Sequence, residues 1–439
     1  MTLHPFQTEA IDWLIKNKSG LLHAATGTGK TIMALEYAKN FKRVLFVVPN
    51  AVKLQWHLEA LKHYNMPLWI ISGTPAERKK QWEANLPFTI VNYELLLKDY
   101  KHVLTQWFDL VIVDECHRMA NHAAKTVRVI KKIKTDRRIA MSATPISNGR
   151  HDLFSQLDWI RPGCLGKNWW QFRNYFCILH RAFPKIVGYQ NQDKFESIIA
   201  PLIYRIPKSV LVGLPALTES VVPFDLSAPE RRFYDTIRKE LILELIREDG
   251  SQELEPIGNA LTKLLRLRQS VNTLTPFGST VSSSKLGVLT ELMSDLLLDP
   301  ENKVLIFSSF KETVKEYYTA LSEKWQGATI TGDTQMAERA VALTMFENRD
   351  SCRFLIGTSA MDTGLNIQAA NIIIHIDDPL SFAKLDQRNG RAHRMGQTRP
   401  VLVYHLRARQ TVDEYIAGIV ARKKEEASFN WKDIKDLLQ

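Results

Sequence analysis

The stretch that decides the fold is SGLLHAATGTGKT, residues 19–31, in which a short apolar run leads into a glycine-containing loop. The run at residues 19–26 predicts a buried strand, and residues 32–40 predict a helix directly after the loop. A strand, a glycine loop and a helix in this order can bind phosphate, because glycines let backbone N–H groups approach phosphate oxygens and the helix N-terminus attracts negative charge. The alternative is a tight strand-to-helix turn with a chance lysine, since Ala24 stands where the general pattern has glycine.

The loop residues have separate expected roles in holding a nucleoside triphosphate. Lys30 is expected to reach the β- and γ-phosphates, and the Thr31 hydroxyl is expected to ligate Mg²⁺. The predicted nucleotide-binding residues of the loop are Thr26, Gly27, Thr28, Gly29, Lys30 and Thr31.

Two adjacent carboxylates follow another apolar run. Residues 110–113 (LVIV) lead directly into Asp114 and Glu115, and open α/β sheets bind their ligands at the carboxyl ends of such strands. Asp114 is suited to hold Mg²⁺, mainly through water because this ion dehydrates reluctantly. Glu115 is suited to orient and deprotonate an attacking water. The alternative is an Asp-Glu pair that only caps the next helix.

A further predicted strand, at residues 137–144, ends in the hydroxyl side chains of Ser142 and Thr144. Hydroxyls near the bound phosphates can pass the state of the nucleotide to the rest of the protein. We therefore predict that these two residues couple the nucleotide site to other parts of the chain.

Apolar runs recur through both halves of the sequence. Runs such as VLFVV, VLIF and NIIIHI are apolar at nearly every position, which is typical of parallel strands covered by helices on both faces. The predicted strands are residues 19–26, 43–49, 88–93, 109–115 and 137–144 in the first half, and 303–309, 354–359, 371–377 and 400–406 in the second. An α/β fold with two parallel sheets is expected.

Helical and aromatic patterns dominate between the two sets of strands. We predict a first domain over residues 1–210, with helical elaboration after about residue 151. A second domain is predicted over residues 211–439, with a helical insertion at about 228–300 and a C-terminal helix.

The composition fits a globular protein with sizeable cores. Of 439 residues, 45% are hydrophobic and 24% are charged, which excludes wholesale disorder. The net charge of +11 favours a polyanionic partner. No C-x-x-C pair occurs among the four cysteines, so no zinc knuckle or disulfide framework is expected.

The same features predict a reducing compartment. No apolar run approaches the length of a membrane helix, and the first ten residues lack the order of a secretion signal. We expect no membrane partner and a cytoplasmic location in a prokaryotic or phage-infected cell, or a nuclear one in a eukaryote.

The second half carries a segment rich in arginine, QRNGRAHRMGQ, which begins at Gln387. Arg391 and Arg394 are three residues apart, a spacing that puts two side chains on one face of a helix. Two guanidinium groups on one face can bind a triphosphate and stabilise its transition state. The alternative is a solvated basic face or a non-specific nucleic-acid patch.

In order, these segments resemble the motifs of helicase superfamily 2, and within it the Swi/Snf-type DNA-translocating ATPases. The resemblance covers nearly the whole chain and is most specific in QRNGRAHRMGQ. ATGTGKT resembles the family's phosphate loop, DECH its acidic box as a DEAH variant, and SATPISN its coupling motif. Gln7 resembles the adenine-reading glutamine, and residues 303–310 (KVLIFSSF) and the GLNIQ segment resemble motifs of the second lobe.

The resemblance implies two RecA-like lobes with ATP and Mg²⁺ in the cleft between them. It implies that Gly364 joins Arg391 and Arg394 at the nucleotide, and that His117 and Gln387 act in coupling with Ser142 and Thr144. Double-stranded DNA is the implied partner of a monomeric core, and a protein partner stays unidentified. The implied nucleic-acid contacts are Pro49, Asn50, Lys53, Asn92, Tyr93, Ser309, Thr331, Gly332 and Thr358.

The sequence departs from the family pattern at two places, and three hypotheses about the function stay open. Cys116 stands where the Swi/Snf branch usually has glycine, and the tryptophan usual after Asp378-Pro379 is missing, which puts a nucleosome-remodelling role in doubt. The leading hypothesis is a DNA-stimulated ATPase that translocates on duplex DNA. The alternatives are a strand-separating helicase on DNA or RNA, and a nucleotide-dependent nucleic-acid-binding module with little turnover.

Overall fold

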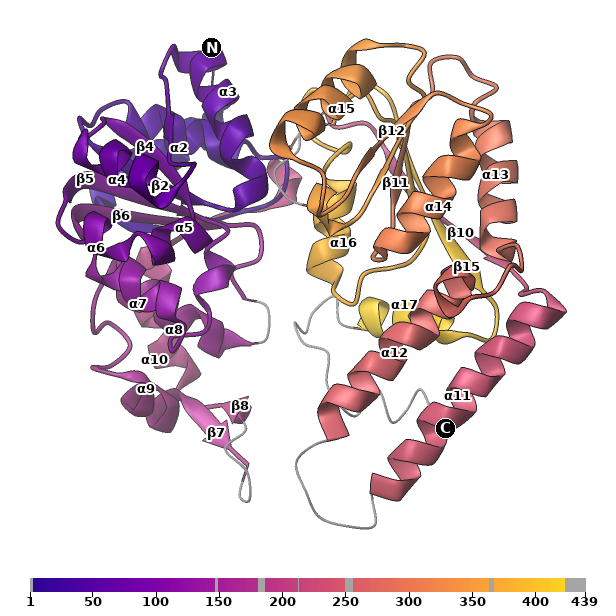
Figure 1. The fold of residues 1–439 in the computed structure, drawn as a ribbon. Helices are drawn as coiled ribbons and strands as arrows, with labels where there is room; N and C mark the ends of the chain where they lie inside the picture. The colour runs from indigo at the N-terminus through magenta and orange to yellow at the C-terminus, as the bar shows by residue number, and fades with distance from the viewer. Residues whose placement is uncertain are drawn as a thin grey trace. The chain divides into compact units, whose positions relative to one another are not determined.

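The computed structural model describes residues 3–146, 149–180, 186–211, 213–248, 256–362 and 367–422. The chain divides into two compact units, Met1–Val212 and Gly213–Gln439. Each unit has its own sheet with helices packed around it (Figure 1).

The first unit is built on a seven-stranded parallel sheet with the strand order β3-β4-β2-β5-β6-β1-β9. Its strands are β1 (Gly20–Ala24), β2 (Val44–Val48), β3 (Trp69–Ile70), β4 (Phe88–Asn92), β5 (Trp107–Asp114), β6 (Lys134–Ser142) and β9 (Ile203–Ile206). Its helices are α1 (Pro5–Asn17), α2 (Lys30–Ala38), α3 (Lys53–Tyr64), α4 (Pro75–Glu83), α5 (Tyr93–Lys98), α6 (Tyr100–Val103), α7 (Lys125–Lys132), α8 (Leu153–Ile160), α9 (Trp169–Phe176) and α10 (Gln192–Ile199). The strands β7 (Cys177–Leu179) and β8 (Ile186–Tyr189) form a separate antiparallel pair.

Both faces of this sheet are buried. Along β5, Val111 and Val113 pack into one apolar cluster, and Leu110 and Ile112 pack into another. Successive side chains of a strand point to opposite faces, so the two clusters lie on opposite sides of the sheet. The continuous apolar runs of the sequence have this physical cause.

The second unit is built on a six-stranded parallel sheet with the order β10-β15-β14-β11-β13-β12. Its strands are β10 (Leu217–Phe224), β11 (Val304–Phe307), β12 (Gly327–Ile330), β13 (Phe354–Gly357), β14 (Ile372–His375) and β15 (Val401–Ala408). Its helices are α11 (Ala228–Glu248), α12 (Pro256–Asn272), α13 (Ser284–Leu296), α14 (Lys311–Ser322), α15 (Met336–Asn348), α16 (Phe382–Asn389) and α17 (Val412–Arg422). The long helices α11 and α12 pack side by side (Figure 1).

The expected fold class, two RecA-like units with parallel sheets and a helical region between the sets of strands, is confirmed. All nine predicted strands are present, as β1, β2, β4, β5 and β6 and as β11, β13, β14 and β15. The sequence prediction missed β3, β9, β10 and β12, which are the outermost strands of the two sheets, and also the separate pair β7 and β8. Helix α17 ends at Arg422, and the helix predicted for the C-terminal stretch, residues 421–439, falls almost entirely outside the described residues.

Two further observations bear on the expected setting of the protein. Across the described ranges, no helix combines the length and the apolar character that crossing a membrane requires. The cysteines Cys116, Cys164, Cys177 and Cys352 carry free thiols.

Candidate active site

The phosphate-loop candidate joins β1 to the N-terminus of α2. Gly27 and Gly29 have φ angles of +83° and +79°, in the left-handed region that glycine enters without a steric penalty. Lys30 is the first residue of α2, and its Nζ donates to the backbone oxygens of Ala24 at 2.9 Å and Ala25 at 3.3 Å. The loop therefore has the strand–loop–helix geometry that the sequence predicts, with its lysine held over the loop.

Gln7 lies against this loop although it is distant in sequence. The side chain is 1% exposed, and its Nε2 donates to the backbone oxygen of Thr28 at 3.0 Å. Its Oε1 accepts from the backbone N–H of His4 at 3.0 Å, so both ends of the amide are fixed. The structure thus brings the predicted adenine-reading residue to the predicted phosphate loop.

Asp114 ends β5 and is buried beside Glu115. Its Oδ2 accepts from the indole Nε1 of Trp56 on α3 at 3.2 Å, and its Oδ1 accepts from the backbone N–H of Glu115 at 2.9 Å. Burial, and then the Glu115 carboxylate, raise the pKa of Asp114 to about 7, although Lys30 acts in the opposite direction. The buried carboxyl of Asp114 beside the half-buried carboxyl of Glu115 suits a hard divalent cation such as Mg²⁺, and Thr31, the second residue of α2, offers a further oxygen ligand.

Glu115 is the centre of a set of polar contacts. Its φ angle is +51°, an unfavourable left-handed conformation for a non-glycine residue, of the kind found at functional sites. Its Oε2 accepts from the hydroxyl of Ser142 at 3.3 Å and lies 3.2 Å from Nδ1 of His117. His117 Nδ1 is also 3.1 Å from Ser142 Oγ, and the backbone N–H of Thr144 donates to the same oxygen at 3.1 Å.

The predicted coupling residues of the first unit therefore meet at the predicted base. A hydroxyl carries one proton, and that of Ser142 is directed to Glu115, so the contact with His117 favours a proton on Nδ1. A movement of β6 would change the position of the Glu115 carboxylate through this hydrogen bond. Their functional roles remain predictions.

The predicted nucleic-acid residues of the first unit follow β2 and β4, which are neighbours in the sheet. Asn50 is exposed, whereas Lys53 is 3% exposed and donates from Nζ to Asn92 Oδ1 at 3.2 Å. Burial lowers the pKa of Lys53. The hydroxyl of Tyr93 donates to the backbone oxygen of Asp114 at 2.5 Å, so this side chain also supports the acidic strand end.

In the second unit, the expected shared helical face of Arg391 and Arg394 is wrong. Helix α16 ends at Asn389, and both arginines lie in the turns after it. Gly390 follows the last helical residue, and glycine is a weak helix former. The Arg391 side chain folds back, with Nε donating to the backbone oxygen of Gln387 at 3.1 Å, and it is buried.

The two predicted motifs of the second unit lie together. Gln368 Nε2 donates to the backbone oxygen of Met395 at 2.5 Å, and the backbone N–H of Ile367 donates to the oxygen of Arg391 at 3.3 Å. Gly364 lies outside the described residues. The turns that carry Arg391 and Arg394, called the arginine turn, are thus fixed against the segment that precedes β14.

The predicted nucleic-acid residues of the second unit share one edge of its sheet. Ser309 follows β11, Thr331 and Gly332 follow β12, and Thr358 follows β13. These three parallel strands are neighbours, in the order β11-β13-β12. Their carboxyl ends therefore bring the three predicted contact points to the same edge.

Several polar residues that support the site were missed at the sequence level. Gln156 of α8 accepts from Cys116 Sγ at 3.0 Å and donates to the backbone oxygen of Pro145 at 2.7 Å, so it joins the acidic box to the coupling motif. Trp56 holds Asp114. Neither residue lies in a motif, and only the fold brings them to their partners.

The folds of the two units define a class: an α/β protein with a candidate phosphate loop in the first unit and a second parallel-sheet unit. A family model described as the SNF2-related domain matches residues 6–275, and one described as the helicase conserved C-terminal domain matches residues 284–396. The chain belongs to the SNF2-related domain family.

Named relatives align with nearly all of the chain. A chromodomain-helicase-DNA-binding protein 1-like protein of Danio rerio is 28% identical over 94% of the chain, and a Mycoplasma pneumoniae protein named as an ATP-dependent helicase is 26% identical over 97%. The chain spans 42% of the length of each of these two curated relatives.

Two solved structures from Sulfolobus solfataricus are similar to the chain. The SWI2/SNF2 ATPase core in complex with dsDNA is 24% identical, with coverage of 97% of this chain and 92% of that one and a TM-score of 0.48. The SWI2/SNF2 ATPase core domain is 25% identical, with coverage of 97% and 89% and a TM-score of 0.44.

Proposed function

We propose that the chain is an ATP-dependent DNA translocase of the Swi/Snf type, which couples ATP hydrolysis to movement on double-stranded DNA. The observation that carries the proposal is the contact set around Glu115. The Glu115 carboxylate is oriented by Ser142 and His117, and it adjoins Asp114, which interacts electrostatically with Lys30. A carboxylate in this setting can position and deprotonate a water for attack on a γ-phosphate.

In the proposed site, the backbone of residues 26–29 and Lys30 bind the phosphates, and Gln7 binds the adenine. Thr31 and Asp114 would hold Mg²⁺, which supplies positive charge to the phosphate oxygens when it is bound. Gly364, Arg391 and Arg394 of the second unit act on the same nucleotide, so hydrolysis requires both units. Gln387 takes part in coupling.

The partner proposed for the sheet edges is the duplex phosphate backbone. The net charge of +11 supports a polyanionic partner, and donors at the ends of parallel strands suit phosphate oxygens. The proposed contact residues are the exposed or half-buried Asn50, Ser309, Thr331 and Gly332. The other predicted residues, Pro49, Lys53, Asn92, Tyr93 and Thr358, are buried and are proposed to support these strand ends from behind. Nucleotide-dependent rearrangement of the two units would move these contacts along the duplex.

The test is ATP hydrolysis measured without nucleic acid and with duplex DNA, single-stranded DNA or RNA. We expect duplex DNA to give the largest stimulation and the stimulation to fall as salt is raised. Glu115→Gln should lower turnover by about 10²- to 10⁴-fold and leave ATP and DNA binding intact. A rate that no nucleic acid changes would contradict the proposal, and absence of turnover in the unmutated chain would favour the binding module.

A further inference from the structure

We propose that Asp377 is a positioning residue in the second unit. It transmits DNA binding at the loop after β11, which contains Ser309 and is called the Ser309 loop, to the arginine turn. The inference rests on the proposed function and adds to it a route by which DNA stimulates hydrolysis. Asp377 follows β14, next to β11 in the sheet, and its side chain is 2% exposed. It belongs to none of the predicted catalytic or binding residues.

The first arm of the route joins Asp377 to the loop after β11. The backbone N–H of Ser309 donates to both carboxylate oxygens of Asp377, at 2.9 Å and 3.0 Å. The hydroxyl of Ser308 donates to Oδ2 at 2.6 Å and accepts from the backbone N–H of Phe310 at 3.2 Å. The conformation of this loop, which carries a proposed DNA contact, therefore depends on the Asp377 carboxylate.

The second arm joins the same residue to the helix that carries the arginine turn. Arg388, which is 1% exposed, donates from Nη1 to the backbone oxygen of Asp377 at 3.3 Å and from Nε to Asp362 Oδ1 at 2.9 Å. Arg388 lies three residues before Arg391, whose backbone N–H donates to the oxygen of Arg388 at 3.1 Å. A shift of Asp377 would therefore displace the base of the arginine turn.

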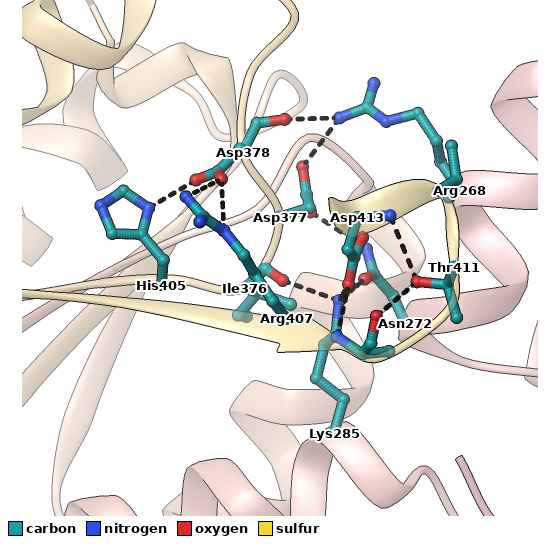
Figure 2. A network of polar contacts seen from close by, with 12 residues as sticks. Arg268, Asn272, Lys285, Ile376, Asp377, Asp378, His405, Arg407, Thr411 and Asp413 are labelled. Atoms are coloured by element: carbon teal, nitrogen blue, oxygen red, sulfur yellow. Dashed lines mark hydrogen bonds and ion pairs between the residues drawn. The ribbon is translucent and has the colours of Figure 1, made fainter. Parts of the chain in front are cut away.

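The helical insertion fixes Asp377 from a third side, as Figure 2 shows. Arg268 Nη2 lies 3.5 Å from Oδ1 of Asp377, and Asn272 Nδ2 donates to Oδ2 at 3.0 Å. Lys285, fully buried, donates to Asn272 Oδ1 at 2.8 Å and to Asp413 Oδ2 at 2.7 Å. Asp377 is thus linked to α12 directly, and through Asn272 and Lys285 to α13 and α17.

The charge of Asp377 is maintained inside the core. Burial would raise its pKa, but Arg268, Arg388 and the serine hydrogen bonds outweigh burial and hold the pKa below its usual value. The ionised carboxylate therefore accepts from several donors at neutral pH. Its neutralisation would leave buried guanidinium charge uncompensated, which is costly in a low-dielectric interior.

The next residue provides a matched control. The side chain of Asp378 is 6% exposed. Its carboxylate accepts from His405 Nδ1 at 2.6 Å and from Arg407 Nε and Nη2 at 3.2 Å and 3.0 Å, both on β15 (Figure 2). Asp377→Asn and Asp378→Asn therefore remove the same charge at adjacent positions. Only the first removes it from the Ser309 loop.

The experiment compares the two variants and the wild-type chain in ATP turnover with and without saturating duplex DNA, and in thermal unfolding. We expect Asp377→Asn to lower the ratio of stimulated to basal rate by about tenfold. Asp378→Asn should lose thermal stability yet keep the wild-type ratio. Asp377→Glu, which retains the charge, should recover part of the stimulation. Ser308→Ala, a milder change in the same arm, should also lower the ratio and covers the case in which Asp377→Asn does not fold.

A wild-type ratio in Asp377→Asn or in Ser308→Ala would overturn the inference, and so would an equal loss of stimulation in Asp378→Asn. A wild-type chain that duplex DNA does not stimulate would overturn the proposed function itself. The wild-type measurement therefore distinguishes the two failures.

Discussion

The hydroxyl of Ser142 on β6 donates a 3.3 Å hydrogen bond to the carboxylate of Glu115, at the end of the neighbouring strand β5. Asp114 and Met141 are paired in the register of these strands, so the contact joins two adjacent strand ends. The carboxylate that we propose activates water is thus held by a residue of the predicted coupling motif.

Removal of this hydroxyl should reduce turnover more than nucleotide affinity. In Ser142→Ala, Glu115 and His117 lose the group that joins them, so we expect kcat to fall by about tenfold or more with KM for ATP changed by less than about threefold. Steady-state kinetics at saturating duplex DNA measures both values. Ser155→Ala is the control, because Ser155 is a buried serine of α8 whose Oγ has no hydrogen-bond partner among the described residues. An unchanged kcat in Ser142→Ala would show that the contact is structural only.

Arg391 should act on the reaction rather than on binding. A guanidinium that stabilises transition-state charge contributes about 10³- to 10⁵-fold to the rate, so Arg391→Ala should lower kcat strongly and ATP affinity weakly. Arg391→Lys should not restore the rate, because an ammonium lacks the planar fork of a guanidinium. The comparison is with Arg399→Ala, which removes a partly exposed arginine paired with Asp299. Equal rates for the alanine variants at positions 391 and 399 would contradict the role.

The stability of the second unit should depend on pH through His375. Burial, and then the neighbouring His405 and Arg388, lower the pKa of His375 to about 3. In the unfolded chain the His375 imidazole binds a proton near the ordinary pKa of 6.5, whereas in the folded chain it stays neutral down to about pH 3. The free energy of unfolding is therefore highest above pH 6.5 and decreases as the pH falls from about 6.5 toward 3. The slope from one such group is at most about 1.4 kcal/mol per pH unit.

The measurement is urea unfolding of the wild-type chain and of His375→Gln between pH 5 and pH 8. The variant loses the titrating group, so the stability difference between the two proteins should change with pH below about 6.5 and stay constant above it. Parallel pH dependences for the two proteins would contradict the assignment.

The sequence predicted the central strands of both sheets and missed the outer ones for a physical reason. A strand buried on both faces, such as β2 with VLFVV, is apolar at every position. An outer strand is half exposed: β10 (LTESVVPF) is mostly exposed or half-buried along its length, and β3 has only two residues. Hydrophobic runs identify the centre of a parallel sheet, and its edges carry a weaker pattern.

The site residues could be predicted where they directly follow one strand in the sequence, as in the phosphate loop and the acidic pair. The supporting residues could not, because their partners come from other elements. Trp56 reaches Asp114 from α3, and Asp377 reaches Ser309 across two neighbouring strands. The prediction that Arg391 and Arg394 share a helical face was wrong, because their spacing does not show that α16 ends at Asn389.

The most direct test of the central claim is displacement of a third strand from a DNA triplex, which reports movement along a duplex without strand separation. We expect the wild-type chain to release the third strand in the presence of ATP and Mg²⁺, and Glu115→Gln to release none. Retention of the third strand by the wild-type chain, under conditions where duplex DNA stimulates its ATP hydrolysis, would contradict translocation.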